Sequence, residues 1–151
     1  MDGGAPQLSN RHHRRDAFRA RERFGAPVRV PRVGVHEFEA DDPIEPYDFG
    51  EPLAGGAVVA HQVSEVWADD GALHIPAVAA LALADSVIHY GDELEFVPDR
   101  LMGNAQKERA GLRGGLARLA ERLEFDHLLL AHGAPIVDEG RERLRAFAAQ
   151  R

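Results

Sequence analysis

The histidine at position 132 stands where a short apolar run meets a turn. Leu128 to Ala131 has the composition of a buried strand, and Gly133 and Pro135 indicate a tight turn directly after it. An imidazole at the end of a strand is carried by a rigid element, which suits a metal ligand or a general base. A turn histidine without a chemical role would have the same local sequence. The rest of the chain is therefore needed to distinguish a functional histidine from a structural one.

An aspartate occupies the same kind of place in another segment. Residues 79–84 are apolar throughout, which predicts a central strand that is buried on both faces, and this strand ends in Asp85. Strands that lie side by side in a sheet bring their ends together at one edge. We therefore expect Asp85 and His132 to converge on one site.

A third group of candidate residues precedes the first predicted helix. The amphipathic pattern of residues 17–24 predicts a helix that Gly25 ends, so His12, His13 and Asp16 would occupy the loop that enters it. This loop supplies two more imidazoles and one more carboxylate to the predicted site.

The absence of cysteine limits the chemistry of such a site. Disulfides, thiolate metal ligands and thiol nucleophiles are excluded. A metal would have to be held by histidines and carboxylates, a donor set that suits zinc, iron or manganese. Imidazole and carboxylate donors together are typical of an open, hydrolytic metal site.

Composition places the chain among ordinary globular domains. It has 151 residues, of which 44% are apolar and 28% charged, and its net charge of −7 argues against general nucleic-acid binding. Residues 11–32 are locally basic, which is most simply a solvated helix face. The lack of a membrane-spanning run and of a signal-peptide core predicts a cytoplasmic protein without a membrane partner. A single lysine, Lys107, among abundant arginine, alanine and glycine suggests a GC-rich bacterial coding sequence.

The order of the remaining elements indicates the fold class. After a disordered or truncated lead-in at residues 1–7, residues 8–151 are predicted to form a single domain. Strands followed by helix, strand and helix predict a layered α/β domain with helices covering a sheet. The expected strands are 27–31, 57–63, 72–76, 79–85 and 128–131, and the later helices 107–123 and 140–150, with a loop at 39–46, a turn at 67–71 and an exposed excursion at 90–98.

At three places the chain resembles the metallo-β-lactamase superfamily. Residues 21–28 look like the helix and strand after that family's first metal motif. Residues 73–85 look like its paired strands ending in the metal aspartate, and residues 128–135 like its last metal histidine in a His-Gly-x-Pro turn. The resemblance covers residues 8–149 and implies an αββα sandwich. The strands with which the family's fold normally begins have no counterpart in this sequence. The resemblance therefore implies an incomplete sandwich, as in a shortened member of the family.

The chain departs from the family's main motif, His-x-His-x-Asp-His. Aligned on Asp16, this chain keeps the first histidine, His12, but has Arg14 and Ala17 at the positions of the other two. The family's next histidine should fall near Val66, where there is none. This departure argues against a two-metal site, because Arg14 would place a cation where a ligand belongs.

Two interpretations of the site remain open. In the first, Asp16, Asp85 and His132 hold one metal ion, His12 or His13 is a fourth ligand or general base, and the substrate is a small ester-type molecule.

In the second, the site has decayed and the chain is a non-catalytic scaffold or binding protein without a metal. Asp85 would then pair with Arg14 or Arg11, and His132 would bond a loop carbonyl. In both cases the missing strands leave an exposed sheet edge that a second copy could cover.

Overall fold

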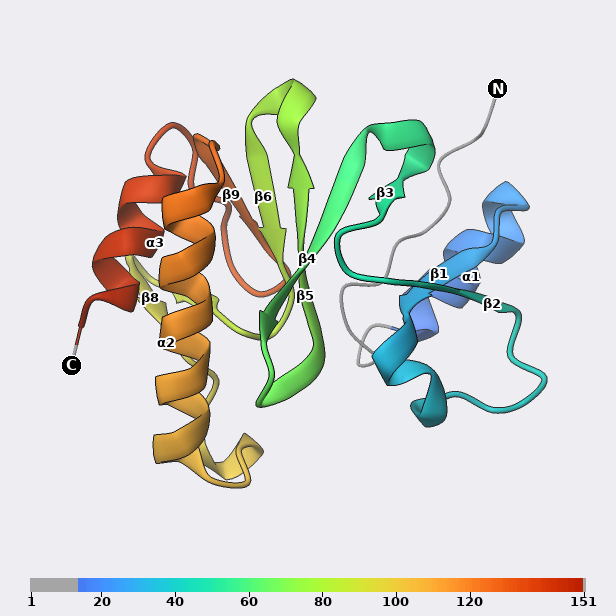
Figure 1. The fold of residues 1–151 in the computed structure, drawn as a ribbon, viewed down its shortest axis with the longest axis horizontal. Helices are drawn as coiled ribbons and strands as arrows, with labels where there is room; N and C mark the ends of the chain where they lie inside the picture. Colours follow the sequence, from blue (N-terminus) through green and yellow to red (C-terminus); the bar gives the residue numbers. More distant parts are fainter. Residues whose placement is uncertain (1–13, 151) are drawn as a thin grey trace.

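The computed structural model describes residues 14–150. Figure 1 shows the later two helices at one end, the main sheet in the middle, and the first helix with two short strands at the other end. The helices are α1 (Arg14–Phe24), α2 (Ala105–Arg122) and α3 (Gly140–Ala148). The strands are β1 (Val28–Pro31), β2 (Ile44–Tyr47), β3 (Pro52–Leu53), β4 (Val58–Ser64), β5 (Trp67–Ile75), β6 (Ala80–Leu83), β7 (Ile88–Tyr90), β8 (Glu93–Glu95) and β9 (His127–Leu130). Short 3-10 helices are η2 (Arg32–Glu37), η3 (Ala54–Gly56), η4 (Pro76–Val78) and η5 (Asp99–Leu101).

The main sheet has five strands in the order β3-β4-β5-β6-β9. Its first four strands pair antiparallel, and β9 joins β6 parallel after a crossover that contains α2. A parallel neighbour requires such a long connection, which explains why the chain forms its longest helix here. The prediction that residues 79–85 form an inner strand is confirmed, because β6 has a neighbour on each side and Leu81 is fully buried.

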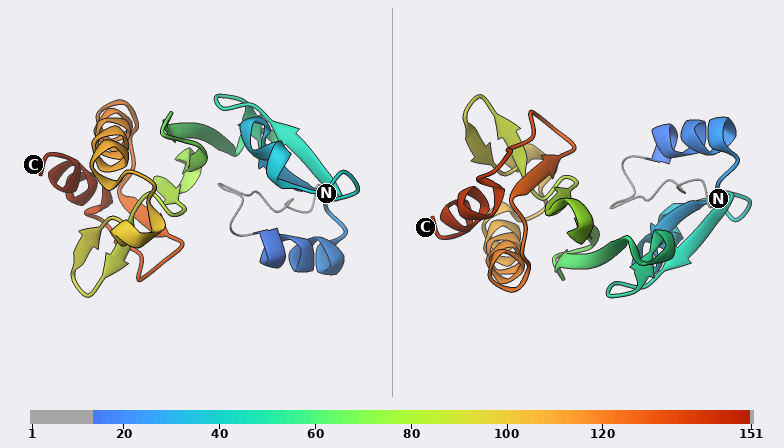
Figure 2. Two further views of the ribbon diagram at one scale, coloured as in Figure 1. Left: turned by 90° about the horizontal axis from the view of Figure 1, so that it is seen from below. Right: turned by 90° about the horizontal axis from the view of Figure 1, so that it is seen from above.

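Helices α2 and α3 pack together over this sheet (Figures 1 and 2). The helix α2 carries an apolar stripe, because Leu112, Leu116 and Leu119 are buried in the main core. Burying one leucine side chain stabilises a fold by roughly 2 kcal/mol, so this stripe anchors the helix. The first helix, α1, instead contacts β1, and Ala17, Val28 and Val30 form a small separate core there.

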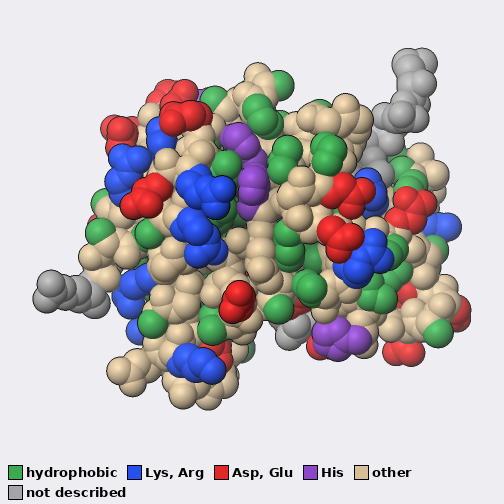
Figure 3. Space-filling view, viewed as in Figure 1, with side chains coloured by type: hydrophobic (Ala, Val, Ile, Leu, Met, Phe, Trp, Pro, Cys, Tyr) green, Lys and Arg blue, Asp and Glu red, His purple; other side chains and the backbone are tan. Residues whose placement is uncertain are grey.

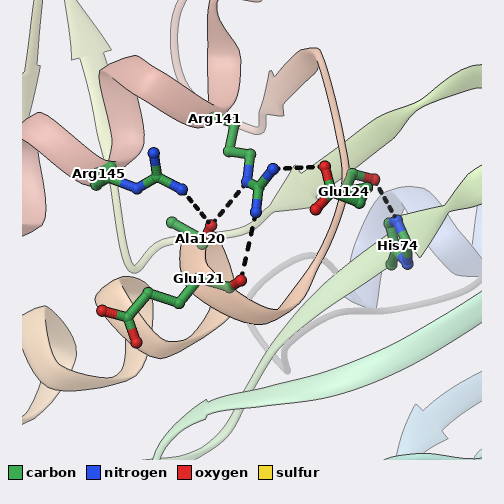
Figure 4. Close-up of polar contacts among 6 residues, drawn as sticks. All are labelled: His74, Ala120, Glu121, Glu124, Arg141 and Arg145. Atoms are coloured by element: carbon green, nitrogen blue, oxygen red, sulfur yellow. Dashed lines mark hydrogen bonds and ion pairs between the residues drawn. The ribbon is translucent and has the colours of Figure 1, made fainter.

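The end of α2 is closed by a side chain from α3 rather than by a glycine cap. Figure 4 shows the guanidinium of Arg141 donating to the carbonyl oxygens of Ala120 (2.8 Å) and Glu121 (3.3 Å) and pairing with the carboxylate of Glu124. Carbonyl groups in the last turn of a helix lack intrahelical donors, and a cation there also meets the negative end of the helix dipole. Arg141 therefore links the two helices at the point where the chain leaves α2.

Three of the predicted connecting segments are wrong in whole or in part. Residues 67–71 were expected to turn but belong to the long strand β5, and residues 44–46 of the expected loop belong to β2. Residues 90–98 were expected to be an exposed excursion, yet part of them forms a hairpin of β7 and β8 whose following Phe96 packs on Phe147 at 4.8 Å between ring centroids. In each case tertiary pairing outweighs the local preference of acidic and proline residues for loops.

Within residues 14–150, no helix combines the length and apolar character needed to cross a bilayer.

Two neighbouring glycines in α2 have opposite roles, which yields a test of the packing. A Cβ atom at Gly115 would lie 1.7 Å from the carbonyl oxygen of Val63 in β4, whereas one at Gly114 would meet nothing within 4 Å. We expect Gly115→Ala to destabilise the chain by about 3 kcal/mol or more, because the helix must move away from the sheet. Gly114→Ala should stabilise it by about 0.5–1 kcal/mol, because alanine favours a helix. Urea unfolding of both variants measures the difference, and equal effects would contradict this packing.

Candidate functional site

Asp85 and His132 meet at the same edge of the main sheet. In the parallel pairing of β6 with β9, Leu83 lies opposite Leu130, and each functional residue comes two positions after its strand's last paired residue. Their side chains are in hydrogen-bond contact, with 2.9 Å between His132 Nε2 and Asp85 Oδ1. The structure thus brings together the two residues that the sequence places at neighbouring strand ends.

The turn that carries His132 is fixed by the hairpin strand β7. The backbone N–H of His89 donates to the carbonyl of His132 at 2.9 Å, and His89 Nδ1 donates to the carbonyl of Ala134 at 2.7 Å. Gly133 has φ +104°, and a Cβ there would lie 2.0 Å from the His89 carbonyl oxygen. Only glycine fits this approach, so the His-Gly step is a requirement of the backbone.

The two side chains differ in exposure. The side chain of His132 is 55% exposed and that of Asp85 15% exposed. Asp85 therefore contacts the imidazole at Nε2 from a less exposed position, while more than half of the His132 side chain stays accessible. The hydrogen bond to this less exposed carboxylate orients the imidazole ring.

Both residues line a cavity of about 650 Å³. Its apolar lining is Val33, Val66, Trp67, Ala68, Val97 and Leu101, and its polar lining includes His36, Asp69, Asp70, Asp85, Glu108 and His132. Apolar walls with a few convergent polar groups are typical of a small-molecule site. Among the described residues that line it, none is lysine or arginine, so this part of the wall is acidic.

The indole of Trp67 is held in place by the beginning of α2. Trp67 Nε1 donates to Glu108 Oε2 at 2.8 Å, while Glu108 Oε1 accepts from the backbone N–H groups of Asn104 (2.9 Å) and Gly103 (3.0 Å). The Asn104 side chain completes this capping arrangement by accepting from the Lys107 N–H. These contacts, the Asn104 hydrogen bond first and the Trp67 hydrogen bond second, lower the pKa of Glu108.

Of the other predicted site residues, only Asp16 is described, and it is not among the residues that line the cavity. His12 and His13 lie outside the described residues. Asp16 lies in the first turn of α1, not in a loop before it; its side chain is exposed and pairs with Arg19 at 3.6 Å. Within residues 14–150, no three histidine or acidic side chains come together as a metal-binding group.

Sequence reasoning assigned no role to several residues of the cavity wall. His36, Asp69, Asp70 and Glu108 all line it, and both aspartates are buried in β5. Their neighbour Trp67 also lines the cavity, on the strand β5 where the sequence predicts a turn at residues 67–71. Two adjacent aspartates between Trp67 and the apolar residues after Gly71 are a signal of a functional strand, because buried carboxylates are rare without a role or partner.

Two histidines, His61 and His74, lie inside the strands β4 and β5. The imidazole of His74 donates from Nε2 to the Glu124 carbonyl at 2.9 Å. The Nε2 atom of His61 is buried without a hydrogen-bond partner among the described residues.

Comparison with solved structures identifies the fold. The chain superimposes on a metallo-beta-lactamase from Pontibacter korlensis with TM-score 0.67 at 14% identity, over 98% of this chain and 70% of that one. It matches TTHA1623 in a di-iron-bound form (TM-score 0.67, 17% identity, 93% and 75% covered). It also matches the DIM-1 metallo-beta-lactamase (TM-score 0.67, 11% identity, 94% and 67% covered). The chain therefore has the metallo-β-lactamase fold, which confirms the αββα fold class that the resemblance implies.

The likeness does not extend to detectable sequence relationship. No protein-family model matches the chain, and neither does any curated protein. At these identities the solved structures establish the fold alone, and activity has to be argued from the site itself.

The cap that holds Trp67 can be tested through its pH dependence. Glu108→Gln should destabilise the chain by about 1 kcal/mol at neutral pH, because the ionised carboxylate accepts three hydrogen bonds. Since the pKa of Glu108 is lowered from its ordinary 4.5, its contribution is present above that value and disappears as the pH falls through the lowered pKa. Urea unfolding of both proteins at neutral pH and at about pH 3 should show this loss.

Trp67 is the only tryptophan, so its fluorescence reports directly on the cap. Glu121→Gln, which removes an exposed carboxylate from the same helix, is the control and should leave the fluorescence unchanged. A destabilisation by Glu108→Gln that is the same at both pH values would contradict the proposed role of the ionised carboxylate.

Proposed function

We propose that this chain is a hydrolase-like protein of the metallo-β-lactamase fold that binds at most one metal ion, with Asp85 and His132 as two of the ligands. The observation that carries the proposal is their 2.9 Å contact at a cavity of about 650 Å³. A nitrogen and an oxygen donor at the ends of adjacent strands are the donor types that zinc, iron or manganese accept.

The described residues supply two donors, one fewer than the three protein ligands of a catalytic zinc site. We propose that the third comes from Asp16, with His12 or His13 as a further ligand or general base. Asp16 would have to leave its ion pair with Arg19 and approach Asp85, which makes it the weakest member of the set. A bound metal would supply an activated water and polarise an ester carbonyl.

The chain's own residues account for the other requirements of a small ester-type substrate. Trp67, Val97 and Leu101 provide apolar surface for its body and exclude water from it. Asp85 orients the imidazole of His132 toward the cavity, and the fixed turn at Gly133 keeps that imidazole in place. A substrate held here would lie beside the pair without a large rearrangement of the backbone.

The alternative is a scaffold or binding protein without a metal. One observation favours it: within residues 14–150, no third histidine or acidic side chain joins Asp85 and His132 in a metal-binding group. In this case the cavity would bind a small molecule without transforming it, and the cytoplasmic location and the second copy at the sheet edge remain predictions shared by both proposals.

Metal content decides between these functions. We expect about one metal ion per chain in tag-free protein supplied with zinc and iron, measured by mass spectrometry, and its loss in Asp85→Asn and His132→Gln. The control is a second His–Asp pair near the same strand: His127 and Asp138, 3.7 Å apart, can be changed to Gln and Asn. These control variants should keep the metal.

Each other outcome has a definite meaning. Absence of metal in the parent protein would contradict the hydrolase-like proposal and leave the scaffold. If both Asp85→Asn and His132→Gln retain the metal, the metal site lies at other residues. Asp16→Asn, His12→Gln and His13→Gln, measured in the same way, identify the remaining ligands, and a screen of ester and thioester substrates with the loaded protein then tests for hydrolysis.

A further inference from the structure

A second cavity, of about 320 Å³, opens between α2 and β4 and shares no described lining residue with the Asp85–His132 cavity. Its lining is Phe49, Gly50, His61, Gln62, Arg118, Leu119, Arg122 and Leu123. Figure 3 shows the surface of this face, where histidine and basic side chains gather beside each other. None of the described lining residues is acidic, although the chain carries 25 acidic residues against 18 basic ones.

The two arginines of this cavity are not neutralised. Arg118 and Arg122 are one helical turn apart on α2, where like charges repel each other by roughly 0.2–0.5 kcal/mol. Arg118 donates one hydrogen bond, to the Val63 carbonyl at 3.2 Å. The guanidinium of Arg122, in the last turn of α2, has no hydrogen bond or ion pair to another described side chain or carbonyl. The other guanidinium of the same region, Arg141, is by contrast fully engaged with α2 and Glu124.

His61 adds an imidazole nitrogen without a hydrogen-bond partner to the same cavity. Its ring lines the cavity and stands 6.1 Å from the ring of His74, and its buried Nε2 has no partner within residues 14–150. Burial, then the charges of His74 and Arg122, lower the pKa of His61. The local field is therefore positive and would favour a negatively charged ligand.

The rest of the lining is apolar. Phe49, Leu119 and Leu123 lie on the same cavity, so a ligand would meet hydrophobic surface next to the cations. A guanidinium pairs with planar or tetrahedral oxyanions through two parallel N–H groups. Cations together with an apolar wall suit a molecule that has an oxyanion at one end and a hydrocarbon body at the other.

We propose that this cavity is a binding site for a small organic oxyanion, with its charged group on Arg118 and Arg122 and its apolar body against Phe49 and Leu123. The site is independent of the proposed metal chemistry. Carboxylates and phosphate monoesters share the required head group, and the test separates them.

The test is calorimetric titration of the full chain with phenyl phosphate, benzoate and inorganic phosphate at low salt. We expect phenyl phosphate or benzoate to bind with a Kd of about 1 mM or below and more tightly than inorganic phosphate, because only the first two use the apolar wall. Preference between the two identifies the head group.

Variants locate the site. Arg122→Gln and Arg118→Gln should each weaken binding about tenfold, the effect of losing one charged hydrogen-bonding partner. The control is Arg100→Gln, which removes the same charge from an exposed arginine outside this cavity and should leave the Kd unchanged. Asp85→Asn should also bind as the parent does, which excludes the first cavity as the place of binding.

A second readout keeps the test decisive if a variant is poorly folded. In the parent protein, NMR titration should shift the backbone amides of residues 61–62 and 118–123 before others. Absence of binding for all three anions, equal weakening by Arg100→Gln, or shifts centred on Asp85 and His132 would each overturn the proposal.

Discussion

The parallel pairing of β6 with β9 is the interaction on which the candidate site depends. It joins segments more than forty residues apart and sets them in a register in which Asp85 and His132 are equally far beyond the paired residues. A shift of one residue would turn the side chains of one strand to the opposite face and separate the pair. The short approach of Gly133 to His89 then fixes where the imidazole stands.

Helix α2 makes this pairing possible and connects the two cavities. It forms the main part of the crossover between β6 and β9, and its glycines let it approach β4 closely. Glu108 at its beginning holds Trp67 in the wall of the first cavity. Arg118 and Arg122 near its end line the second. A displacement of this helix would therefore alter both cavities, whereas a local change at Asp85 would alter only one.

Charge is divided between the two cavities in opposite ways. The described lining of the first cavity includes Asp69, Asp70, Asp85 and Glu108, and that of the second includes two arginines and His61. Placing like charges together in one cavity lowers the stability of the fold, because these charges repel each other. A bound ligand or a buried partner of opposite charge can offset this repulsion. The same fold can thus present two chemically different surfaces to small molecules.

The sequence alone determined the fold class, the main helices and the strand ends that carry Asp85 and His132, because apolar periodicity and the Gly-Pro turn are local signals. Only the tertiary structure decided that Asp69 and Asp70 belong to a buried strand, that Asp16 lies in a helix paired with Arg19, and that Arg118, Arg122 and His61 line one cavity. These facts depend on strand register and on contacts between segments that are distant in the sequence. Local sequence patterns do not reveal such contacts, because their free energy comes from residues far along the chain.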